Sequence, residues 1–387
     1  MPEQSRQHGG LIIVQNRETQ FDAPLYRQIH QQQILPLQVV YTMSGATIQD
    51  RDAELGFEPQ WDHLTIESYL KVNLANTSPR AIWTLSRTMR RQSPGLVLIC
   101  GYYPRLHLLL ALFLRLQGQR IGLRSDNTLT HTSFTGLKGR IRRTVVGWIQ
   151  RLFDSWHPVG AQAHTYLSTI SGASIPSFRF AYAVDNDWFA QQSSAARPRR
   201  AQFLAEQGWP EDAVVVLGIL KWHAREDPLT LIRGFALLQA RCPQARLVLV
   251  GDGPLRDAVM QAVAPLEAAI HCPGYVAYSQ LPHWYAMADV FVHPSPDEPW
   301  GVSVNEAMAC GLPVITARGV GAAHELIVDG VNGRVVADRD PEALAAALEA
   351  LLNNHDLRQR MGARCRTVIE GWSYRQTIEA FQQALAH

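Results

Sequence analysis

A segment in the second half of the chain places two carboxylates on either side of an anion site. Glu298 and Glu306 are separated by seven residues, and Gly301 lies between them. A helix that begins near Gly301 leaves its first backbone N–H groups unpaired at the positive end of the helix dipole, where phosphate is the usual ligand. Gly301 has no side chain to hinder a close approach, and the Ser303 hydroxyl adds a donor. We therefore expect the backbone of Gly301, Val302 and Ser303 to bind phosphate.

The two carboxylates beside this site require hydroxyl groups as neighbours. Glu298 precedes the helix, and Glu306 lies a little more than one turn inside it, with a side chain that leans back toward the helix N-terminus. A carboxylate next to phosphate is unfavourable unless hydroxyl donors occupy it, and sugar or ribose hydroxyls meet that condition. Taken singly, Glu298 also fits a solvated loop residue and Glu306 a residue that supports the helix N-terminus. In combination with Gly301 they favour a ligand that bears phosphate and hydroxyl groups.

The elements around this segment follow one another without long loops. An apolar run at 290–293 leads into a proline-rich loop, the helix follows, and Gly311 and Pro313 end it before the next apolar run. The same alternation of apolar runs and amphipathic stretches continues along the chain and is typical of parallel sheets covered by helices, the α/β class. The predicted strands are residues 11–14, 37–42, 96–100, 120–123 and 155–159 in the first half, and 213–217, 246–250, 290–293 and 313–316 in the second.

Length and composition indicate an ordinary globular protein. The 387 residues suffice for two or three domains, and we expect a first domain at 1–190, a polar linker at 191–200 and a second domain at 201–370. An apolar stretch at 106–116 is too short to cross a bilayer and predicts a buried helix. The five cysteines form neither a CxxC pair nor a Cys/His cluster, so no disulfide framework or zinc site is indicated. Because the polar N-terminal residues lack the pattern of a secretory signal, we expect a cytoplasmic protein.

The formal net charge of +2 is unevenly distributed along the chain. Residues 1–200 contain 22 Lys and Arg against 13 Asp and Glu, a formal charge of +9. The excess is concentrated at residues 136–153, where basic and apolar side chains interleave in a helical rhythm. Such a segment suits an anionic membrane surface, and peripheral attachment to the inner membrane face is one interpretation. A surface helix with one buried face and one solvated basic face is the more common case. No zinc-finger or RNP-type motif accompanies the charge, so nucleic acid is not expected as a partner.

The segment EPWGVSVNEAMACGLPVI resembles the signature of the large family of retaining glycosyltransferases usually numbered four. The resemblance extends over the second half, in VVVLGILKWHAREDPLTLIRGFALL, RLVLVGDGPLRDAV, CPGYVAYSQLPHWYAMADVFVHPS and GAAHELIVDGVNGRVV. It implies the GT-B architecture, in which two Rossmann-like domains face each other across a cleft. It also implies that residues 371–387 form a C-terminal helix that crosses back to the first domain. No metal and no cofactor are implied, because a nucleotide diphosphate sugar is the co-substrate.

The resemblance implies donor-binding roles for residues of the second domain. Glu298 contacts hydroxyl groups of the donor sugar, and Glu306 holds the ribose of the nucleotide. These roles agree with the hydroxyl groups that the two carboxylates require. The backbone of Gly274, Tyr275 and Val276 receives the base.

The resemblance also implies a pair of basic residues that neutralises the diphosphate leaving group. Ile219 stands where the family usually has an arginine, and Lys221 and Arg225 are the best available pair when the segment is anchored on the Asp-Pro dipeptide that follows. Departure of a nucleoside diphosphate builds negative charge. Two cations and a helix N-terminus directed at that charge would stabilise the transition state.

The first domain is expected to bind the acceptor through loops that follow its predicted strands. The acceptor-binding candidates are Arg17, Gln20 and Phe21 after the first strand, and Arg124, Ser125 and His131 after the strand at 120–123. Asp126 could act as a general base on an acceptor hydroxyl, and with even weight it could be the N-cap of a helix.

Together these patterns predict a retaining glycosyltransferase that moves a sugar from a nucleotide diphosphate sugar to a glycan or a lipid-linked acceptor. Polysaccharide or glycolipid biosynthesis of the cell envelope is the expected setting. Two other functions stay open: a nucleotide-sugar epimerase of the same architecture, and a GT-B scaffold without catalytic activity. The epimerase would interconvert a sugar nucleotide without any acceptor. The scaffold would bind a partner and fail to bind a donor.

Overall fold

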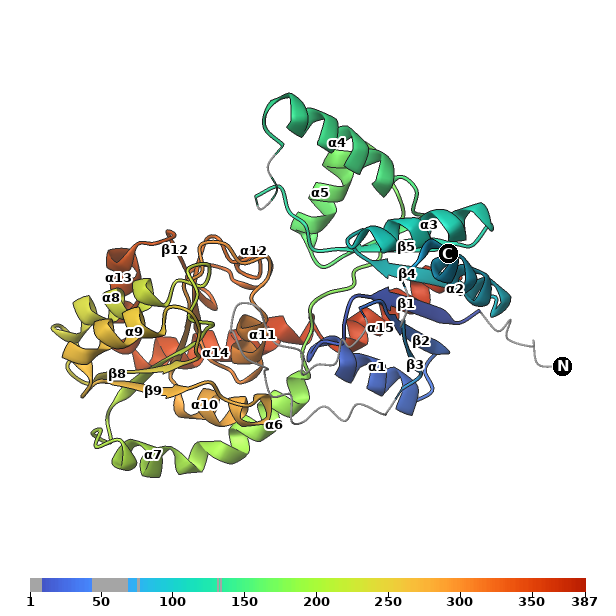
Figure 1. Cartoon of the computed structure of the whole chain (residues 1–387). Coiled ribbons are helices and arrows are strands. Elements are labelled where there is room, and N and C mark those ends of the chain that lie inside the picture. The colour runs from blue at the N-terminus through green and yellow to red at the C-terminus, as the bar shows by residue number, and fades with distance from the viewer. Residues whose placement is uncertain (1–8, 44–68, 75–76, 131, 133) are drawn as a thin grey trace. The chain divides into compact units, whose positions relative to one another are not determined.

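The computed structural model describes residues 9–43, 69–74, 77–130, 132 and 134–387 (Figure 1). These residues form two compact units. Within the described ranges, unit 1 comprises residues 9–43, 69–182 and 374–387, and unit 2 comprises residues 183–373. His131, one of the acceptor candidates, lies outside the described residues.

Unit 1 is built on a parallel sheet whose described strands run in the order β3-β2-β1-β4-β5-β6. The strands are β1 (Leu11–Gln15), β2 (Leu37–Tyr41), β3 (Lys71–Asn73), β4 (Leu96–Cys100), β5 (Ile121–Ser125) and β6 (Ser155–Pro158). The helices are α1 (Asp22–Gln31), α2 (Pro79–Arg91), α3 (Arg105–Leu116), α4 (Gly136–Gln150), α5 (Ala161–Ser171) and α15 (Tyr374–Ala386). The strand order reverses direction between β1 and β4. In α/β sheets, ligands bind at such a switch point, beyond the carboxyl ends of the strands.

The apolar runs of unit 1 become its buried strands. All residues of β1 are buried, as expected for a parallel sheet that helices cover on both faces. The C-terminal helix α15 belongs to this core, because the ring of Phe381 lies 4.8 Å from that of Phe180. The guanidinium of Arg120 also donates a hydrogen bond of 2.8 Å to the carbonyl of Ala384. The end of the chain is thus part of unit 1, although the residues before it belong to unit 2.

Unit 2 repeats the same architecture. Its described strands run in the order β12-β11-β10-β7-β8-β9, which is the Rossmann order 3-2-1-4-5-6 read from the opposite edge. The strands are β7 (Val214–Ile219), β8 (Ala245–Val250), β9 (Ile270–Gly274), β10 (Val290–His293), β11 (Val314–Ala317) and β12 (Gly333–Val336). The α-helices are α6 (Asn186–Ala196), α7 (Arg200–Glu206), α8 (Pro228–Gln239), α9 (Arg256–Val263), α10 (Leu281–Met287), α11 (Val302–Ala309), α12 (Ala323–Leu326), α13 (Pro341–Leu352) and α14 (His355–Glu370). Its switch point lies between β7 and β10.

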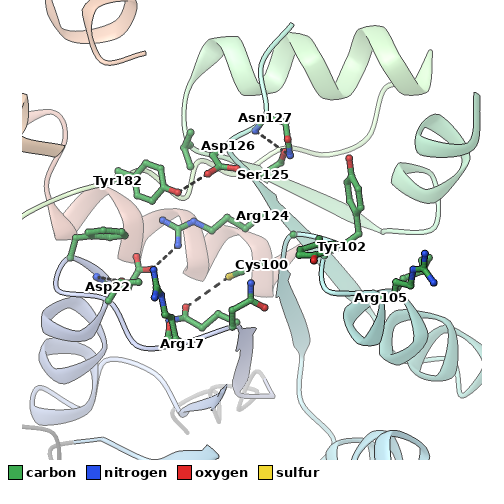
Figure 2. A pocket seen from close by; sticks show the side chains of 18 of the residues that line it. Arg17, Asp22, Cys100, Tyr102, Arg105, Arg124, Ser125, Asp126, Asn127 and Tyr182 are labelled. Carbon is green, nitrogen blue, oxygen red and sulfur yellow. Dashed lines mark hydrogen bonds and ion pairs between the residues drawn. The ribbon is translucent and has the colours of Figure 1, made fainter. Parts of the chain in front are cut away.

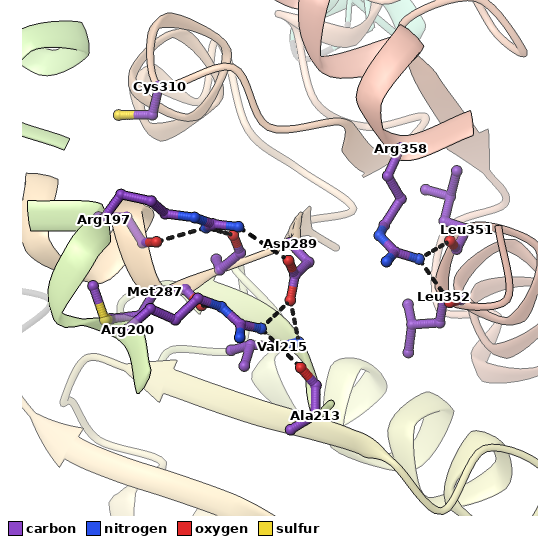
Figure 3. A network of polar contacts seen from close by, with 12 residues as sticks. Arg197, Arg200, Ala213, Val215, Met287, Asp289, Cys310, Leu351, Leu352 and Arg358 are labelled. Carbon is purple, nitrogen blue, oxygen red and sulfur yellow. Dashed lines mark hydrogen bonds and ion pairs between the residues drawn. The ribbon is translucent and has the colours of Figure 1, made fainter. Parts of the chain in front are cut away.

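The linker expected at residues 191–200 is helical instead. It runs from α6 through a 3₁₀ turn, Arg197–Arg199, into α7. Figure 3 shows what holds this segment on unit 2: Arg197 and Arg200 both form ion pairs with Asp289, at 3.3 and 2.6 Å. Arg197 also donates to the carbonyls of Ala286 and Ala288 at the C-terminal end of α10. The polar composition that suggested a linker therefore serves to anchor these helices, and the chain passes from unit 1 to unit 2 earlier, after Tyr182.

The strands predicted from apolar runs all occur, with ends shifted by at most two residues, whereas β3, β9 and β12 were not predicted. These three strands are short or only partly buried, so their sequences lack a continuous apolar run. The stretch at 106–116 is a helix, α3, with Leu110, Ala111 and Leu114 buried. None of the helices that the structure describes is long and apolar enough to span a membrane.

Candidate functional site

Two loops at the switch point of unit 2 bring the predicted donor residues together. The loop after β7 carries Lys221 and Arg225, and the loop after β10 carries Glu298 and leads to Gly301. β7 and β10 are neighbours in the sheet and parallel, so their carboxyl ends lie at the same edge. Residues that are more than 70 positions apart in the sequence therefore form one site.

Arg225 and Glu298 form an ion pair between Nη1 and Oε2. The backbone of Arg225 is fixed as well, because the Ser295 hydroxyl donates a hydrogen bond of 2.6 Å to its carbonyl. Both charged side chains are partly buried, at 26% and 16% exposure. The arginine predicted for the leaving group and the glutamate predicted for the donor sugar are thus in direct contact.

Glu226 links Lys221 to Arg225 and was not among the predicted site residues. Its carboxylate accepts a hydrogen bond of 2.7 Å from the backbone N–H of Lys221 and one of 3.5 Å from Nη2 of Arg225. Burial, and next the neighbouring carboxylate of Glu298, raise the pKa of Glu226 to about 7. Its position between Arg225 and Asp227, the N-cap of α8, is the only signal that the sequence offered.

The GDG segment after β8 supports the loop that carries Lys221. A Cβ atom at Gly251 would lie 1.8 Å from the carbonyl oxygen of Leu220, and one at Gly253 would lie 2.7 Å from that of Trp222. The backbone N–H of Trp222 donates to the carbonyl of Asp252 at 2.9 Å. The glycines therefore permit the close approach of the loops after β7 and β8.

Gly301 begins α11 in a left-handed conformation, with φ of +88°. A side chain there would be strained by this φ value, and its Cβ would lie 3.0 Å from Val320. Among the described residues, no group accepts a hydrogen bond from the backbone N–H of Val302 or Ser303. The N-terminus of α11 therefore offers the two free donors that the sequence predicted for phosphate.

His293, at the end of β10, lies next to this helix N-terminus and was missed in the sequence. Its Nδ1 is 3.3 Å from the Ser303 hydroxyl, and its Nε2 is buried without a partner among the described residues. Burial lowers the pKa of His293 to about 4, so the ring is neutral near pH 7. It therefore offers a hydrogen bond, without a charge, to a ligand bound at α11.

Glu306 is buried one turn further along α11. The Tyr285 hydroxyl donates a hydrogen bond of 2.7 Å to its Oε2, and burial raises the pKa of Glu306 to about 7. A buried carboxylate that accepts one hydrogen bond from a hydroxyl group is stabilised by further hydrogen-bond donors. This matches the ribose role that the resemblance implied. Gly274, at the end of β9, has φ of +81° and no atom within 4 Å of its Cβ position, and Tyr275 and Val276 follow it in the loop.

A second site lies at the switch point of unit 1, where a cavity of about 700 Å³ opens beyond β1, β4 and β5 (Figure 2). Of the predicted acceptor residues, the cavity is lined by Arg17, Phe21, Arg124, Ser125 and Asp126. Gln20 is not among its lining residues. The cavity also includes residues that the sequence analysis did not select, among them Asp22, Tyr102, Arg105, Arg142 and Tyr182.

Asp126 faces the cavity in contact with Tyr182, whose hydroxyl donates a hydrogen bond of 2.8 Å to its carboxylate. No helix of the described residues begins at Asp126, since the next one, α4, starts at Gly136. The alternative that Asp126 caps a helix is therefore wrong. Its carboxylate is available to accept a hydrogen bond from a ligand in the cavity.

Arg124 is buried in the floor of this cavity. It forms an ion pair of 2.8 Å with Asp22, and its guanidinium lies 3.6 Å from the ring centre of Phe180 and 4.8 Å from that of Tyr182. Arg124 thus holds α1, β5 and the segment before unit 2 together, which is a positioning role. No group of three His, Cys, Asp or Glu side chains suitable for a metal ion occurs in the part of the chain that the structure describes.

Comparison with known proteins gives a match for the second half of the chain. Residues 200–368 match the family described as "Glycosyl transferases group 1". The chain is 32% identical over 202 residues to a GDP-mannose-dependent alpha-(1-6)-phosphatidylinositol monomannoside mannosyltransferase of Mycolicibacterium smegmatis, covering 50% of this chain and 51% of that protein. It is 33% identical over 201 residues to a D-inositol 3-phosphate glycosyltransferase of Frankia alni, covering 48% and 49%. The chain thus spans about half the length of these relatives.

Solved structures match over nearly the whole chain. The structure of Alr3699/HepE from Anabaena in complex with UDP has a TM-score of 0.74 at 16% identity, covering 97% of this chain and 99% of that one. A glycosyltransferase from Rickettsia africae has a TM-score of 0.74 at 14% identity, covering 97% of each chain. Both units therefore have the fold of the GT-B proteins, as the sequence predicted.

Proposed function

We propose that the protein transfers a sugar from a nucleotide diphosphate sugar to an acceptor. The premise is that residues 200–368 of this chain belong to the glycosyl transferases of group 1. The observation that carries the proposal is the cluster at the switch point of unit 2. It combines the Arg225–Glu298 ion pair, the free N–H groups that begin α11, and the buried Glu306. An anion site next to two carboxylates suits a ligand with both phosphate and hydroxyl groups.

In this proposal the donor exchanges partners within the cluster. The diphosphate binds the N–H groups of Val302 and Ser303 and attracts Arg225 and Lys221. Glu298 then turns from Arg225 to the hydroxyls of the sugar, and Glu306 accepts from the ribose. The base lies along Gly274, Tyr275 and Val276. Since negative charge grows on the leaving diphosphate, these cations and the helix N-terminus stabilise the transition state more than the ground state.

The acceptor binds in the cavity of unit 1 in this proposal, with Asp126 as the base that accepts the proton of the attacking hydroxyl. Transfer with retained anomeric configuration, by substitution on the front side of the sugar, is part of the same proposal. The acceptor is a glycan or a lipid-linked molecule, and an anionic membrane surface is the proposed partner of residues 136–153. The names of two relatives mention phosphate-bearing molecules, phosphatidylinositol monomannoside and inositol 3-phosphate, and this supports an acceptor that bears phosphate.

The first experiment is a screen of the purified protein against UDP, GDP, ADP and TDP sugars. Selective binding raises the melting temperature by linkage, and slow hydrolysis or transfer reports the anomeric configuration of the released sugar. A selective donor with retained configuration supports the proposal. A protein that binds no donor with or without vesicles and candidate acceptors would be a scaffold, and interconversion of a sugar nucleotide without acceptor would make it an epimerase.

A further inference from the structure

Helix α4 of unit 1 has an exposed apolar face that no described residue of unit 1 covers. Large apolar side chains recur at intervals of four, four and three residues, and therefore lie along one side of the helix. They are Leu137 at 74% exposure, Ile141 at 58%, Val145 at 50% and Trp148 at 68%, here called the apolar stripe. The sequence alone favoured a helix that buries its apolar side, so this exposure is a finding of the structure.

The buried residues of the helix lie toward its C-terminal end, and its first half contacts unit 1 mainly through Gly139 and Arg142, which both pack against Phe134. Of residues 136–145 all but Gly139 are exposed, whereas Val146, Gly147 and Gln150 are buried. Gly147 packs against α5, where a Cβ atom would lie 2.5 Å from the carbonyl oxygen of Ile170. In Figure 1 the N-terminal end of α4 points away from the strands of unit 1, whereas Val146 of α4 and Leu167 of α5 belong to the core that those strands form. The apolar stripe is therefore not needed to hold the helix in place.

The charges beside the apolar stripe are all positive. Lys138, Arg140, Arg142 and Arg143 lie on this helix, which contains no Asp or Glu. None of the four forms an ion pair with a described residue. An apolar stripe with basic residues on both sides is the arrangement of a helix that lies in the interface of an anionic bilayer. Trp148 adds an aromatic ring, which also favours the interface of the bilayer.

We propose that α4 docks on an anionic lipid bilayer with the apolar stripe inserted among the headgroups and the four basic side chains on lipid phosphates. Arg142 also lines the cavity of unit 1, so docking brings that cavity to the membrane surface. This consequence fits a lipid-linked acceptor and rests on the proposed function. The docking itself does not depend on sugar transfer.

Vesicle sedimentation of the full chain, without any nucleotide sugar, tests the docking. At about 0.15 M salt we expect at least about tenfold stronger binding to phosphatidylcholine vesicles with about a third phosphatidylglycerol than to pure phosphatidylcholine. Combined Leu137→Ser, Ile141→Ser and Trp148→Ser substitutions should weaken binding at least about tenfold. The matched control replaces three exposed apolar residues of unit 2, Leu237→Ser, Val328→Ser and Val331→Ser, and should bind as the unchanged protein does.

Two further measurements separate insertion of the apolar stripe from adsorption by charge. Brominated lipids should quench tryptophan fluorescence in the unchanged protein and less so in a Trp148→Phe variant, because only an inserted ring meets the bromine atoms. Lys138→Gln with Arg140→Gln should weaken binding by about fivefold per charge at low salt. Circular dichroism and melting temperature check that each variant is folded.

Three results would overturn the proposal. Equal binding of the apolar stripe variant and the unchanged protein would mean adsorption by charge alone. Equal binding to neutral and anionic vesicles would remove the role of the basic residues. A concentration-dependent dimer that the stripe variant abolishes, with no vesicle binding, would identify a second copy of the chain as the occupant. Failure to transfer sugar leaves all three readouts unaffected, so it tests only the proposed function.

Discussion

At the scale of single residues, the charged side chains of the site in unit 2 contact one another. Arg225 neutralises Glu298, and Glu226 accepts from both Arg225 and the backbone of Lys221. In the proposed function, the diphosphate of the donor competes with Glu298 for Arg225. In that proposal the exchange suits transition-state stabilisation, because the arginine is already within reach and negative charge grows on the leaving group as the bond breaks.

Replacing Arg225 by glutamine should lower kcat/KM for the donor by roughly 10²–10³-fold, since the leaving group loses a cation and Glu298 loses its partner. The measurement is steady-state transfer with the donor found in the screen. Arg233→Gln, an exposed arginine on α8, is the charge-matched control and should leave kcat/KM unchanged. Equal rates for the Arg225 variant and the unchanged protein would remove Arg225 from the mechanism.

The raised pKa of Glu306 predicts how the free energy of unfolding depends on pH. Its pKa is raised by burial to about 7, above the ordinary value of 4.5. Between these values the unfolded chain releases a proton that the folded protein keeps, so the free energy of unfolding falls as pH rises from about 4.5 to 7. Glu306→Gln keeps the acceptor for Tyr285 and removes this titration. We expect the variant to gain up to about 3 kcal/mol relative to the unchanged protein between pH 5 and pH 8.

Denaturant unfolding at pH 5 and at pH 8 measures the effect of Glu306→Gln on the free energy of unfolding. Thermal shift with the donor measures the loss of ribose binding. Because the ionised carboxylate is the better acceptor, donor affinity of the unchanged protein should rise between pH 6 and pH 8. Donor affinity that is the same in the variant and in the unchanged protein would rule out the ribose role. A stability difference that does not change with pH would mean that Glu306 is already ionised in the folded protein.

At the scale of elements, the loop at 318–322 holds Glu298 in place. The backbone of Glu298 accepts a hydrogen bond of 2.8 Å from Gly321 and donates one of 3.0 Å to Gly319. Cβ atoms at Gly319 and Gly321 would lie 2.0 Å from the carbonyl oxygens of Pro296 and Pro299. Two glycines thus let a loop after β11 pair with the loop after β10, which a sequence pattern of apolar runs cannot indicate.

Gly321→Ala should destabilise unit 2 by roughly 1–3 kcal/mol and weaken donor binding, because the added methyl group displaces the strand-like pairing of Glu298. The control is Gly371→Ala, where the nearest atom to the new Cβ is 3.4 Å away and φ is −75°. Melting temperature and donor affinity are measured for both. A Gly321 variant as stable as the control, with full donor affinity, would show that Glu298 does not depend on this loop.

At the scale of the whole molecule, two units with the same strand order present different chemistry at their switch points. Unit 2 offers helix N–H groups and carboxylates, and unit 1 offers a cavity with arginines and Asp126. In the proposed function each unit therefore binds one substrate. Substitutions in unit 1 should affect transfer and leave the affinity for the donor unchanged.

Asp126→Asn tests this division, because the amide keeps the size of the side chain and an oxygen that accepts from Tyr182. Transfer to the acceptor should fall by about 10²-fold or more, with unchanged donor affinity by thermal shift. Asp187→Asn, an exposed carboxylate on α6, controls for loss of charge. A variant that transfers at the normal rate would exclude Asp126 as the base, and one that loses donor affinity would contradict the separation of the two sites.

The sequence by itself determined the fold class and the residue types that gather at the candidate site of unit 2. Apolar runs such as 11–14 and 290–293 must be buried, and parallel strands are the way to bury them between helices. Glu298, Gly301 and Glu306 lie within nine residues, so local spacing was enough to select them as candidates. These features depend on hydrophobic burial and on helix geometry, which act over a few turns of chain.

Only the tertiary structure decided how distant segments meet. It paired Arg225 with Glu298 and brought Glu226 and His293 next to the predicted residues. It also brought Asp126 into contact with Tyr182 and left the apolar stripe of α4 exposed. It also turned the expected linker into helices anchored on Asp289. These outcomes depend on which strands are neighbours and which helix faces find a partner. Such long-range packing is not encoded in the spacing of any single segment.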